Sequence, residues 1–428
     1  MRNRITDRMT IIGVVLGALL SLTGIASGQP TLVVTPEGSF SPPYFTTETG
    51  AQIHQPSMLV KTAVDIYVPN STIFIAPGEY RESGVYSKPT TLLVPSGAAV
   101  IGHTNLGDST TLSIASLNTH LVGDTSALIG ATWDYWADDQ RAIDIANICA
   151  HPLNQWDFVA LSEVWDEDFF CDDCCGNCEP DTSVITPILD QSGYLEGRIG
   201  DDLHGDFLSS GLAVMSQYPI SLFAQLDFQD CPHNPCDGDD CLANKGFVWS
   251  TIHKDGFAIN IINTHTQASN AHINQITRIL QMQCINTQIS NHRSVSPNDL
   301  YFIVGDLNVP GETVTEYYNN MRLSFPLFND AVRNVPGFKK EEQYTNSPDN
   351  KLAKCFDCGT VDARLDYILF IPASENGNVR VVPRTAGRYK FLGSSITADC
   401  DECPDADVAT IEKSDHWAVE GEFEIYRP

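Results

Sequence analysis

Short apolar runs in this sequence are repeatedly followed by side chains that can bind a metal ion or transfer a proton. Asn118 ends one run, Glu163 follows a second, and Asn263-Thr264-His265-Thr266-Gln267 follows a third. A fourth run leads into Gly305-Asp306-Leu307-Asn308, and Ser414-Asp415-His416-Trp417 lies near the C-terminus. Carboxylate and amide oxygens suit a hard cation such as Mg²⁺, and imidazoles can move protons. Together these groups could hydrolyse a phosphate ester.

Phosphodiester hydrolysis requires this combination of groups. The charge on the phosphoryl group must be neutralised, a water must be deprotonated and aimed in line, and the departing alkoxide needs a proton. Each motif alone is weak, because a glutamate after an apolar strand is usually its solvated end and a lone histidine is more often structural. Their occurrence together, each at the end of a strand-like run, favours a metal-dependent phosphodiesterase.

The order of these motifs resembles that of the endonuclease/exonuclease/phosphatase superfamily, which includes pancreatic deoxyribonuclease. The motifs are Leu161-Ser162-Glu163-Val164, Asn263-Thr264-His265-Thr266, Gly305-Asp306-Leu307-Asn308, Leu365-Asp366-Tyr367-Ile368 and Ser414-Asp415-His416. Within the superfamily the chain most resembles the secreted neutral sphingomyelinases of bacteria. The segments typical of that branch are Gly211-Leu212-Ala213-Val214-Met215-Ser216 followed by Tyr218-Pro219-Ile220, Asn244-Lys245-Gly246-Phe247-Val248, Thr264-His265-Thr266-Gln267-Ala268 and Tyr344-Thr345-Asn346-Ser347-Pro348.

The resemblance implies a sphingomyelin phosphodiesterase-like hydrolase of the phospholipase C type, which cleaves sphingomyelin to ceramide and phosphocholine. It implies Mg²⁺ as the cofactor, with Mn²⁺ or Co²⁺ as alternatives because oxygen-rich sites accept several such ions. Glu163 would be the main metal ligand, with Asn118 near the metal and the phosphate and Asp415 on the metal side. Lys245 would add positive charge near the phosphate; a solvated lysine after a loop is the alternative.

The same resemblance assigns the groups that act on the reacting atoms. Asp306 and Asn308 would bind the phosphoryl group and orient the attacking water. His416 would be the general base, and Asp366 would orient it by a hydrogen bond that fixes the imidazole tautomer. His265 would be the acid that protonates or stabilises the leaving ceramide oxygen.

Alternating strand-like and helix-like segments must position these residues. The predicted strands are Thr111–Ala115, Phe158–Leu161, Leu212–Met215, Gly246–Trp249, Ile259–Ile262, Tyr301–Val304 and Asp366–Phe370. Apolar residues at three- and four-residue steps predict helices over Asp138–Ala150 and Asn270–Ser290. Many short strands with few long helices favour an α/β fold: a four-layered sandwich of two packed, mainly antiparallel or mixed sheets flanked by helices.

The N-terminal region predicts a different organisation. Arg2, Arg4 and Arg8 precede a short apolar run and small residues at 26–28, which predicts a signal peptide over 1–28 and a secreted or periplasmic protein; an uncleaved anchor is the alternative. Residues 29–108 read as a β-rich accessory module resembling a fragment of a parallel β-helix, or as a strand-rich extension of the next domain. Residues 109–428 would form the metal-dependent phosphodiesterase domain.

Thirteen cysteines in an exported chain predict disulfides, with at least one thiol left over. Cys231, Cys236 and Cys241 lie in a loop rich in Pro, Gly and Asp, where a local bridge would hold irregular backbone. The chain has four Cys-x-x-Cys pairs: Cys171/Cys174, Cys175/Cys178, Cys355/Cys358 and Cys400/Cys403. Because export favours oxidation, disulfides are expected there, and a closed tetrahedral zinc site made from two of the pairs is the alternative.

The charge balance separates the candidate functions. The 428 residues carry 25 basic and 54 acidic side chains, a formal net charge of −29, which would repel a polyphosphate backbone. A phospholipid substrate, sphingomyelin in particular, is therefore favoured over DNA, and an extracellular nuclease or other phosphodiesterase of the same superfamily is the alternative. A non-catalytic exported scaffold would be expected to have lost some of these polar groups.

Contact with a membrane is expected to be peripheral at most. Secreted bacterial relatives often carry an aromatic-rich hairpin for membrane insertion between the positions of Asp366 and Asp415. This chain offers only Tyr389 and Phe391 there, beside Arg388 and Lys390. A strong apolar wedge is absent from the sequence, so lysis of intact membranes is not expected.

Overall fold

The computed structural model describes most of the chain from residue 109 onward and six short strands before it. The described residues are 31–34, 52–55, 72–75, 78–80, 91–93, 99–101, 109–121, 137–165, 185–200, 209–232, 241, 245–335, 343–356, 361–398 and 408–427. The predicted signal peptide lies outside them, as do the cysteines at 171, 174, 175, 178, 358, 400 and 403. Disulfides and zinc therefore both stay predictions for those pairs.

The chain divides into two compact units. One comprises Met1–Leu106 with the short segments Pro219–Leu222 and Ile252–Gly256, and the other comprises Gly107–Tyr218, Phe223–Thr251 and Phe257–Pro428. The division into residues 29–108 and 109–428 stays a prediction.

Every described strand before residue 106 pairs in parallel. The strands are β1 (Thr31–Val34), β2 (Gln52–Gln55), β3 (Thr72–Ile75), β4 (Gly78–Tyr80), β5 (Thr91–Leu93) and β6 (Ala99–Ile101). They form a sheet of order β2-β1-β3-β5 and a separate pair, β4-β6. Parallel neighbours cannot be joined by tight hairpins. Parallel pairing is also what a β-helix-like fragment requires.

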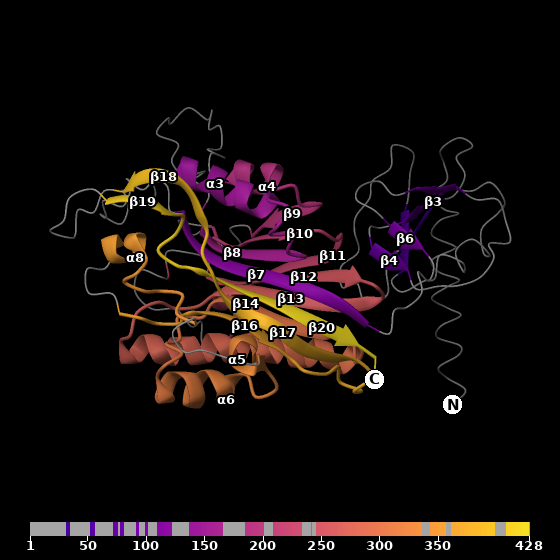
Figure 1. The fold of residues 1–428 in the computed structure, drawn as a ribbon. Coiled ribbons are helices and arrows are strands. Elements are labelled where there is room, and N and C mark those ends of the chain that lie inside the picture. Colours follow the sequence, from indigo (N-terminus) through magenta and orange to yellow (C-terminus); the bar gives the residue numbers. More distant parts are fainter. Residues whose placement is uncertain are drawn as a thin grey trace, which may run out of the picture. The chain divides into compact units, whose positions relative to one another are not determined.

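Two six-stranded mixed sheets form the centre of the second unit (Figure 1). The first has the order β17-β20-β7-β8-β10-β9, with β7 (Ser109–Leu121), β8 (Phe158–Val164), β9 (Glu196–Ile199), β10 (Ala213–Ser216), β17 (Arg380–Tyr389) and β20 (Ala418–Tyr426). The second has the order β11-β12-β13-β14-β16-β15, with β11 (Ile220–Asp227), β12 (Gly246–Lys254), β13 (Phe257–His265), β14 (Leu300–Asp306), β15 (Asn329–Asp330) and β16 (Asp366–Phe370). A two-stranded ribbon adds β18 (Leu392–Ala398) and β19 (Val408–Glu412).

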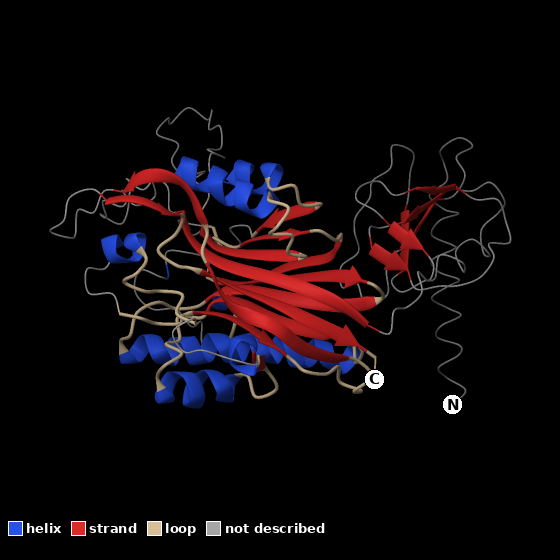
Figure 2. Cartoon of the chain, viewed as in Figure 1, coloured by secondary structure: helices blue, strands red, loops and turns tan. Residues whose placement is uncertain are grey.

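Helices cover the outer face of each sheet, so the unit has four layers (Figure 2). Helices α3 (Asp138–Ala150) and α4 (Ile185–Gln191) lie on the first sheet, and α5 (His272–Val295) and α6 (Arg322–Ser324) lie on the second. The remaining helical segments are η2 (Phe228–Asp230), η4 (Val314–Met321), α7 (Ala331–Asn334) and α8 (Lys351–Phe356). The predicted α/β sandwich is confirmed. Among the described residues, no helix combines the length and apolar character needed to span a bilayer.

The aromatic residues considered for membrane contact belong to the core instead. Tyr389 and Phe391 pack against Trp156, with ring centroids 5.1 Å and 5.6 Å from it, in the cluster between the first sheet and α3. Phe391 is 2% exposed. Neither ring is therefore exposed as an apolar wedge, and peripheral membrane contact stays a prediction.

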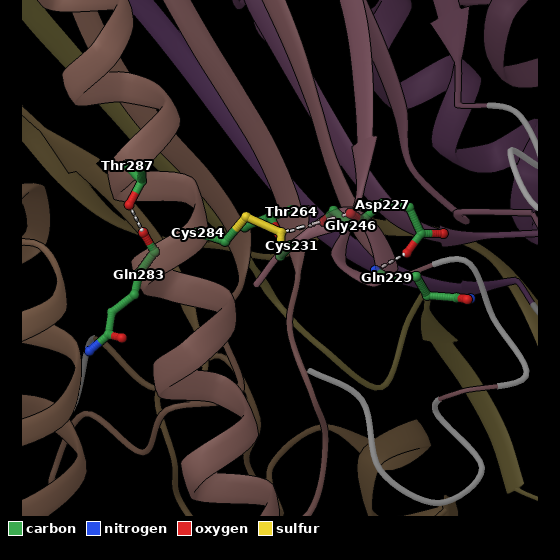
Figure 3. The surroundings of a disulfide bond; sticks show 8 residues. All are labelled: Asp227, Gln229, Cys231, Gly246, Thr264, Gln283, Cys284 and Thr287. Atoms are coloured by element: carbon green, nitrogen blue, oxygen red, sulfur yellow. Dashed lines mark hydrogen bonds between the residues drawn. A yellow bond between two sulfur atoms is a disulfide. The ribbon is translucent and has the colours of Figure 1, made fainter. Parts of the chain in front are cut away.

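A disulfide joins Cys231, just after η2, to Cys284 in the middle of α5, with Cα atoms 6.0 Å apart. The expectation of a local bridge within the 231–241 loop is therefore wrong for Cys231, because α5 passes beside the end of η2. Figure 3 shows this disulfide near Gly246 and Thr264, whose hydroxyl donates to the Gly246 carbonyl at 2.7 Å. Cys149 is a buried free thiol.

Replacing both Cys231 and Cys284 with Ser should lower the free energy of unfolding by about 2–4 kcal/mol, because the bridge closes a long loop in the unfolded chain. Urea unfolding under oxidising conditions would measure the difference from the parent protein. Equal unfolding midpoints and slopes would contradict this expectation.

Candidate active site

The strand registers bring the predicted site residues together from both sheets. In the second sheet, His265 on β13 pairs with Asp306 on β14, which in turn pairs with Asp366 on β16. In the first sheet, Asn118 on β7 pairs with the residue before Glu163 on β8. Parallel neighbours end at the same edge of a sheet, so the polar residues at these strand ends lie close together.

A buried amide side chain links the two sheets close to these strand ends. Asn263 on β13 donates to the backbone carbonyls of Leu161 on β8, at 2.8 Å, and of Ala213 on β10, at 3.2 Å. Because Asn263 lies two residues before His265 and Leu161 two before Glu163, these hydrogen bonds fix the offset between the functional ends of the sheets.

Three residues of the site have a strained backbone conformation. His120, Glu163 and Asn308 have left-handed φ values of 48°, 55° and 49°. Such values are uncommon outside glycine and cost roughly 1–2 kcal/mol each. They occur where each strand ends, so they turn these side chains out of the regular pleat and into the cluster.

Glu163 lies at the centre of the carboxylate side of the site. Its Oε1 accepts from Asn118 Nδ2 at 2.8 Å, and the same amide donates to Asp306 Oδ2 at 3.1 Å. Glu163 Oε2 lies 3.2 Å from His120 Nδ1, which is also 3.8 Å from Asp415 Oδ2. These contacts bring Glu163, Asn118 and Asp415, the three residues expected at the metal, into one buried cluster.

His120 is a site residue that the sequence reasoning missed. It is 5% exposed and lies two positions after Asn118 near the end of β7, where its left-handed backbone departs from the regular pleat. Only its distances to Glu163 and Asp415, residues far along the chain, identify it as part of the site. Burial opposes protonation of His120, but Asp415 and Glu163 outweigh it and raise the pKa of this imidazole.

The environment keeps Glu163 ionised. Burial alone would raise the pKa of this carboxyl, but the hydrogen bond from His120, the nearby His265 and the Asn118 amide together hold it well below its usual range. The ionised Glu163 carboxylate is a group of the kind that a divalent cation would need as a ligand.

His416 and Asp366 form the tightest pair of the site. His416 Nδ1 lies 2.7 Å from Asp366 Oδ2, and Asp306 Oδ2 is 3.9 Å from the same nitrogen. The Thr345 hydroxyl oxygen accepts a hydrogen bond from the Asp366 backbone N–H at 3.2 Å, and the Thr345 carbonyl accepts one from the Trp417 backbone N–H at 2.7 Å. Thr345 therefore holds the backbone of Asp366 and that of the residue after His416. Burial disfavours the imidazolium, yet Asp366 and Asp415 raise the pKa of His416 well above its usual value.

His265 lies opposite this pair. Its Nε2 is 3.6 Å from Glu163 Oε1, 3.9 Å from Asp306 Oδ2 and 3.3 Å from Lys245 Nζ. Lys245 also donates to the Thr266 carbonyl at 3.1 Å and is 5% exposed, so the alternative of a solvated lysine is wrong. All nine predicted site residues thus lie in one region, including Asn308, whose backbone N–H donates to Asp306 Oδ1 at 2.7 Å.

Two groups of donors could hold a metal ion. Among the described residues, Asp306, Asp366 and His416 present ligand atoms that all lie within 4.8 Å of one another. However, the His416 imidazole is already hydrogen-bonded to Asp366, an arrangement that orients a base. Glu163, Asp415 and Asn118 provide the oxygen donors that suit a hard cation, and their role as metal ligands stays a prediction.

A buried arginine holds two segments of the candidate site at fixed positions. Arg141 of α3 is fully buried; its Nη1 donates to the carbonyls of Thr119 and Lys413, both at 2.9 Å, and its Nη2 to the His120 carbonyl. Asp138 neutralises its charge. One side chain therefore ties the end of β7 to the segment that begins Ser414-Asp415-His416.

Arg141→Met should lower the free energy of unfolding by about 3 kcal/mol or more, because three buried carbonyls and Asp138 would lose their partner. Arg198→Met is the matched control, since Arg198 is exposed and pairs only loosely with Glu196 at 3.5 Å. Urea unfolding would measure both variants. A destabilisation in Arg141→Met no larger than in the control would contradict this role.

Asp366→Asn should shift the acidic limb of the pH–rate profile to lower pH while reducing the maximal rate. The Asp366 carboxylate raises the pKa of His416, so its removal lowers that pKa and leaves the neutral imidazole populated further into acid. The rate falls because an amide can hold the wrong tautomer. Initial rates between pH 4 and 9 would test this, and an acidic limb that stays fixed or moves upward would contradict it.

The layered sheets and the converging strand ends define a class: the chain has the fold of the endonuclease/exonuclease/phosphatase superfamily. It is similar in sequence to sphingomyelinase C of Bacillus cereus, at 26% identity over 284 residues, covering 64% of this chain and 79% of that one. Sphingomyelinase C of Listeria ivanovii is 34% identical over 203 residues, 46% of this chain and 55% of that one.

The structural comparison supports the same fold. A crystal structure of a beta toxin mutant from Staphylococcus aureus with bound magnesium ions superimposes with a TM-score of 0.54 at 20% identity, covering 73% of this chain and 99% of that one. No family model matches the chain. The resemblance to bacterial sphingomyelinases that the motifs indicate is confirmed.

Proposed function

We propose that this protein is a secreted, metal-dependent phosphodiesterase that hydrolyses sphingomyelin to ceramide and phosphocholine. The names of its relatives agree with the enzyme class expected from the sequence, a phospholipase C-type hydrolase. The observation that carries the proposal is the meeting of two imidazoles with a continuous group of carboxylates: His416 contacts Asp366 and Asp306, and His265 faces Asp306 and Glu163.

His416 acts as the general base. Its hydrogen bond to Asp366 keeps the proton on Nδ1, so the Nε2 lone pair is the one that accepts a proton from the attacking water. Asp306 and Asn308 lie beside this base, and the Asn308 side chain is held by a hydrogen bond to the Thr266 carbonyl at 3.1 Å. They orient the water and the phosphoryl oxygens.

His265 acts on the leaving group. Lys245 and Glu163 flank its Nε2 on two sides and hold the imidazole toward the shared centre of the site. From there it gives a proton to the ceramide oxygen, or stabilises the charge that develops on it. A divalent cation held by Glu163, Asp415 and Asn118 would supply the positive charge that neutralises the phosphoryl oxygens.

The substrate assignment is tested by comparing sphingomyelin, phosphatidylcholine and DNA as substrates of the purified full chain, with Mg²⁺ and with a chelator. Metal-dependent release of phosphocholine, faster from sphingomyelin, is the expected result. Cleavage of DNA would favour the nuclease alternative, which the charge of −29 disfavours. Inactivity on all three substrates would contradict the proposal.

A further inference from the structure

Asn350 is a fully buried asparagine whose side chain contacts the segment that carries His416. Its Nδ2 donates to the backbone carbonyls of Ser414, at 2.8 Å, and of Asp415, at 3.1 Å. We propose that Asn350 is a positioning residue of the reaction, which holds His416 where its imidazole meets Asp366. This inference rests on the proposed function, because it concerns how the general base of that reaction is held.

The peptide unit before His416 is held at both of its edges. Its carbonyl, which belongs to Asp415, accepts from Asn350 Nδ2, and its N–H, which belongs to His416, donates to Ser414 Oγ at 3.0 Å. Because a peptide unit is planar, hydrogen bonds on opposite edges fix its orientation. The Ser414 hydroxyl also donates to the Asn118 carbonyl at 2.5 Å, so this peptide unit is anchored to β7 of the first sheet.

The peptide unit after His416 is held as well, because the Trp417 N–H donates to the Thr345 carbonyl at 2.7 Å. With both neighbouring peptide planes fixed, only the side-chain torsions of His416 remain free. The contact of its Nδ1 with Asp366 Oδ2 at 2.7 Å fixes those torsions. Removing the donors of Asn350 therefore releases one of the two planes and lets the imidazole move away from Asp366.

The neighbours of the Asn350 amide determine its orientation. Its Oδ1 accepts from the backbone N–H groups of Leu352, at 2.9 Å, and of Ala353, at 3.3 Å, in the first turn of α8, as the side chain of a helix N-cap residue does. A flipped amide would face donors with donors and carbonyls with an oxygen. The Asn350 backbone is fixed too, since its N–H donates to the Ser347 carbonyl at 2.9 Å and its carbonyl accepts from the Lys354 N–H at 3.1 Å.

The first test replaces the two donors and keeps the cap of α8. Asn350→Ser retains an oxygen that can accept from the first turn of the helix, and Asn350→Asp also retains the shape of the side chain. Both variants should lower kcat for phosphocholine release by about 10- to 100-fold, because a small displacement of a catalytic group is costly. KM should change by less than about threefold, since the fully buried Asn350 side chain donates to backbone carbonyls of the protein.

Asn260→Ser is the matched control. Asn260 on β13 is also fully buried; its Nδ2 donates to the Leu300 carbonyl at 3.2 Å and to Asp299 Oδ2 at 3.1 Å, and its Oδ1 accepts from Trp249 Nε1 at 2.9 Å. A thermal melt should show comparable losses of stability in Asn260→Ser and Asn350→Ser, while the control keeps the kcat of the parent. An equal loss of kcat in the control would overturn the proposal.

A double-mutant cycle tests whether Asn350 acts through His416. The residual rate of His416→Ala is measured at high enzyme concentration, with and without Asn350→Ser. The second substitution should change that rate by less than about threefold, because no imidazole is left to position. An equal fold-loss in both backgrounds would show that Asn350 only supports the fold, and the positioning role would be rejected.

Proton NMR gives a readout that does not depend on the substrate. The Nδ1 proton of His416, hydrogen-bonded to Asp366, gives a low-field imidazole signal, which is assigned by its loss in His416→Ala. Both Asn350 variants should shift or broaden this signal, and Asn260→Ser should leave it unchanged.

The two proposals can therefore fail separately. If the parent releases no phosphocholine from sphingomyelin and the low-field signal still depends on Asn350, the proposed function fails while the positioning of His416 stands. If phosphocholine is released and the Asn350 variants keep the kcat and the signal of the parent, the proposed function stands and the positioning role is wrong.

Discussion

His416→Ala is expected to lower kcat for phosphocholine release by about 10²–10⁴-fold, the contribution typical of a general base, while the protein stays folded. The imidazole it removes is the one held at 2.7 Å by Asp366 and 3.9 Å from Asp306. Without it, the attacking water has no group to take its proton. Adding metal should not restore the rate, because the cation neutralises the phosphoryl group and does not replace the base.

Steady-state kinetics at saturating Mg²⁺, with a thermal melt of the same samples, would measure this loss. His151→Ala is the control, since that imidazole is exposed. Near-normal turnover of folded His416→Ala would show that the base has been assigned to the wrong residue.

Glu163→Gln is expected to raise the metal concentration needed for half-maximal activity by about 10- to 100-fold, the range typical of altered metal sites. The substitution keeps the shape of the side chain and an oxygen that can accept from Asn118, but it removes the negative charge. That charge is partly exposed and held ionised by His120 and His265, so its loss acts on the cation more than on the fold.

Glu420→Gln is the matched control. Glu420 on β20 is partly buried and accepts a hydrogen bond from Trp156 Nε1 at 2.9 Å, much as Glu163 accepts one from Asn118. Activity would be titrated against Mg²⁺ for both variants. An unchanged metal requirement in Glu163→Gln, or an equal shift in the control, would remove Glu163 from the metal site.

Local patterns were sufficient for the central elements. The helix predicted over Asp138–Ala150 has the same bounds in the structure, and the second helix, His272–Val295, begins and ends slightly later than predicted. The apolar strand runs form β7, β8, β10, β12, β13, β14 and β16. In the same unit, strands β9, β11, β15, β17, β18, β19 and β20 were not predicted. Strand β17, for example, has polar, exposed residues along much of its length and so carries no continuous apolar signal.

The disulfide, the buried Arg141 and the missed site residue His120 depend on partners far along the chain. Cys231 pairs with a cysteine 53 residues away, and Arg141 binds a carbonyl 272 residues away. His120 is recognisable only through its distances to Glu163 and Asp415. No spacing in the sequence encodes such contacts.

The sequence by itself determined the residue types at the strand ends and the order of the motifs, because side-chain chemistry and local periodicity are properties of short segments. Only the tertiary structure decided that Glu163 lies between Asn118, His120 and His265, and that His416 pairs with Asp366. Those proximities arise from the registers of β7 with β8 and of β13, β14 and β16, and from the packing of the two sheets. Pairing between strands is a non-local interaction, so it is fixed when the chain folds.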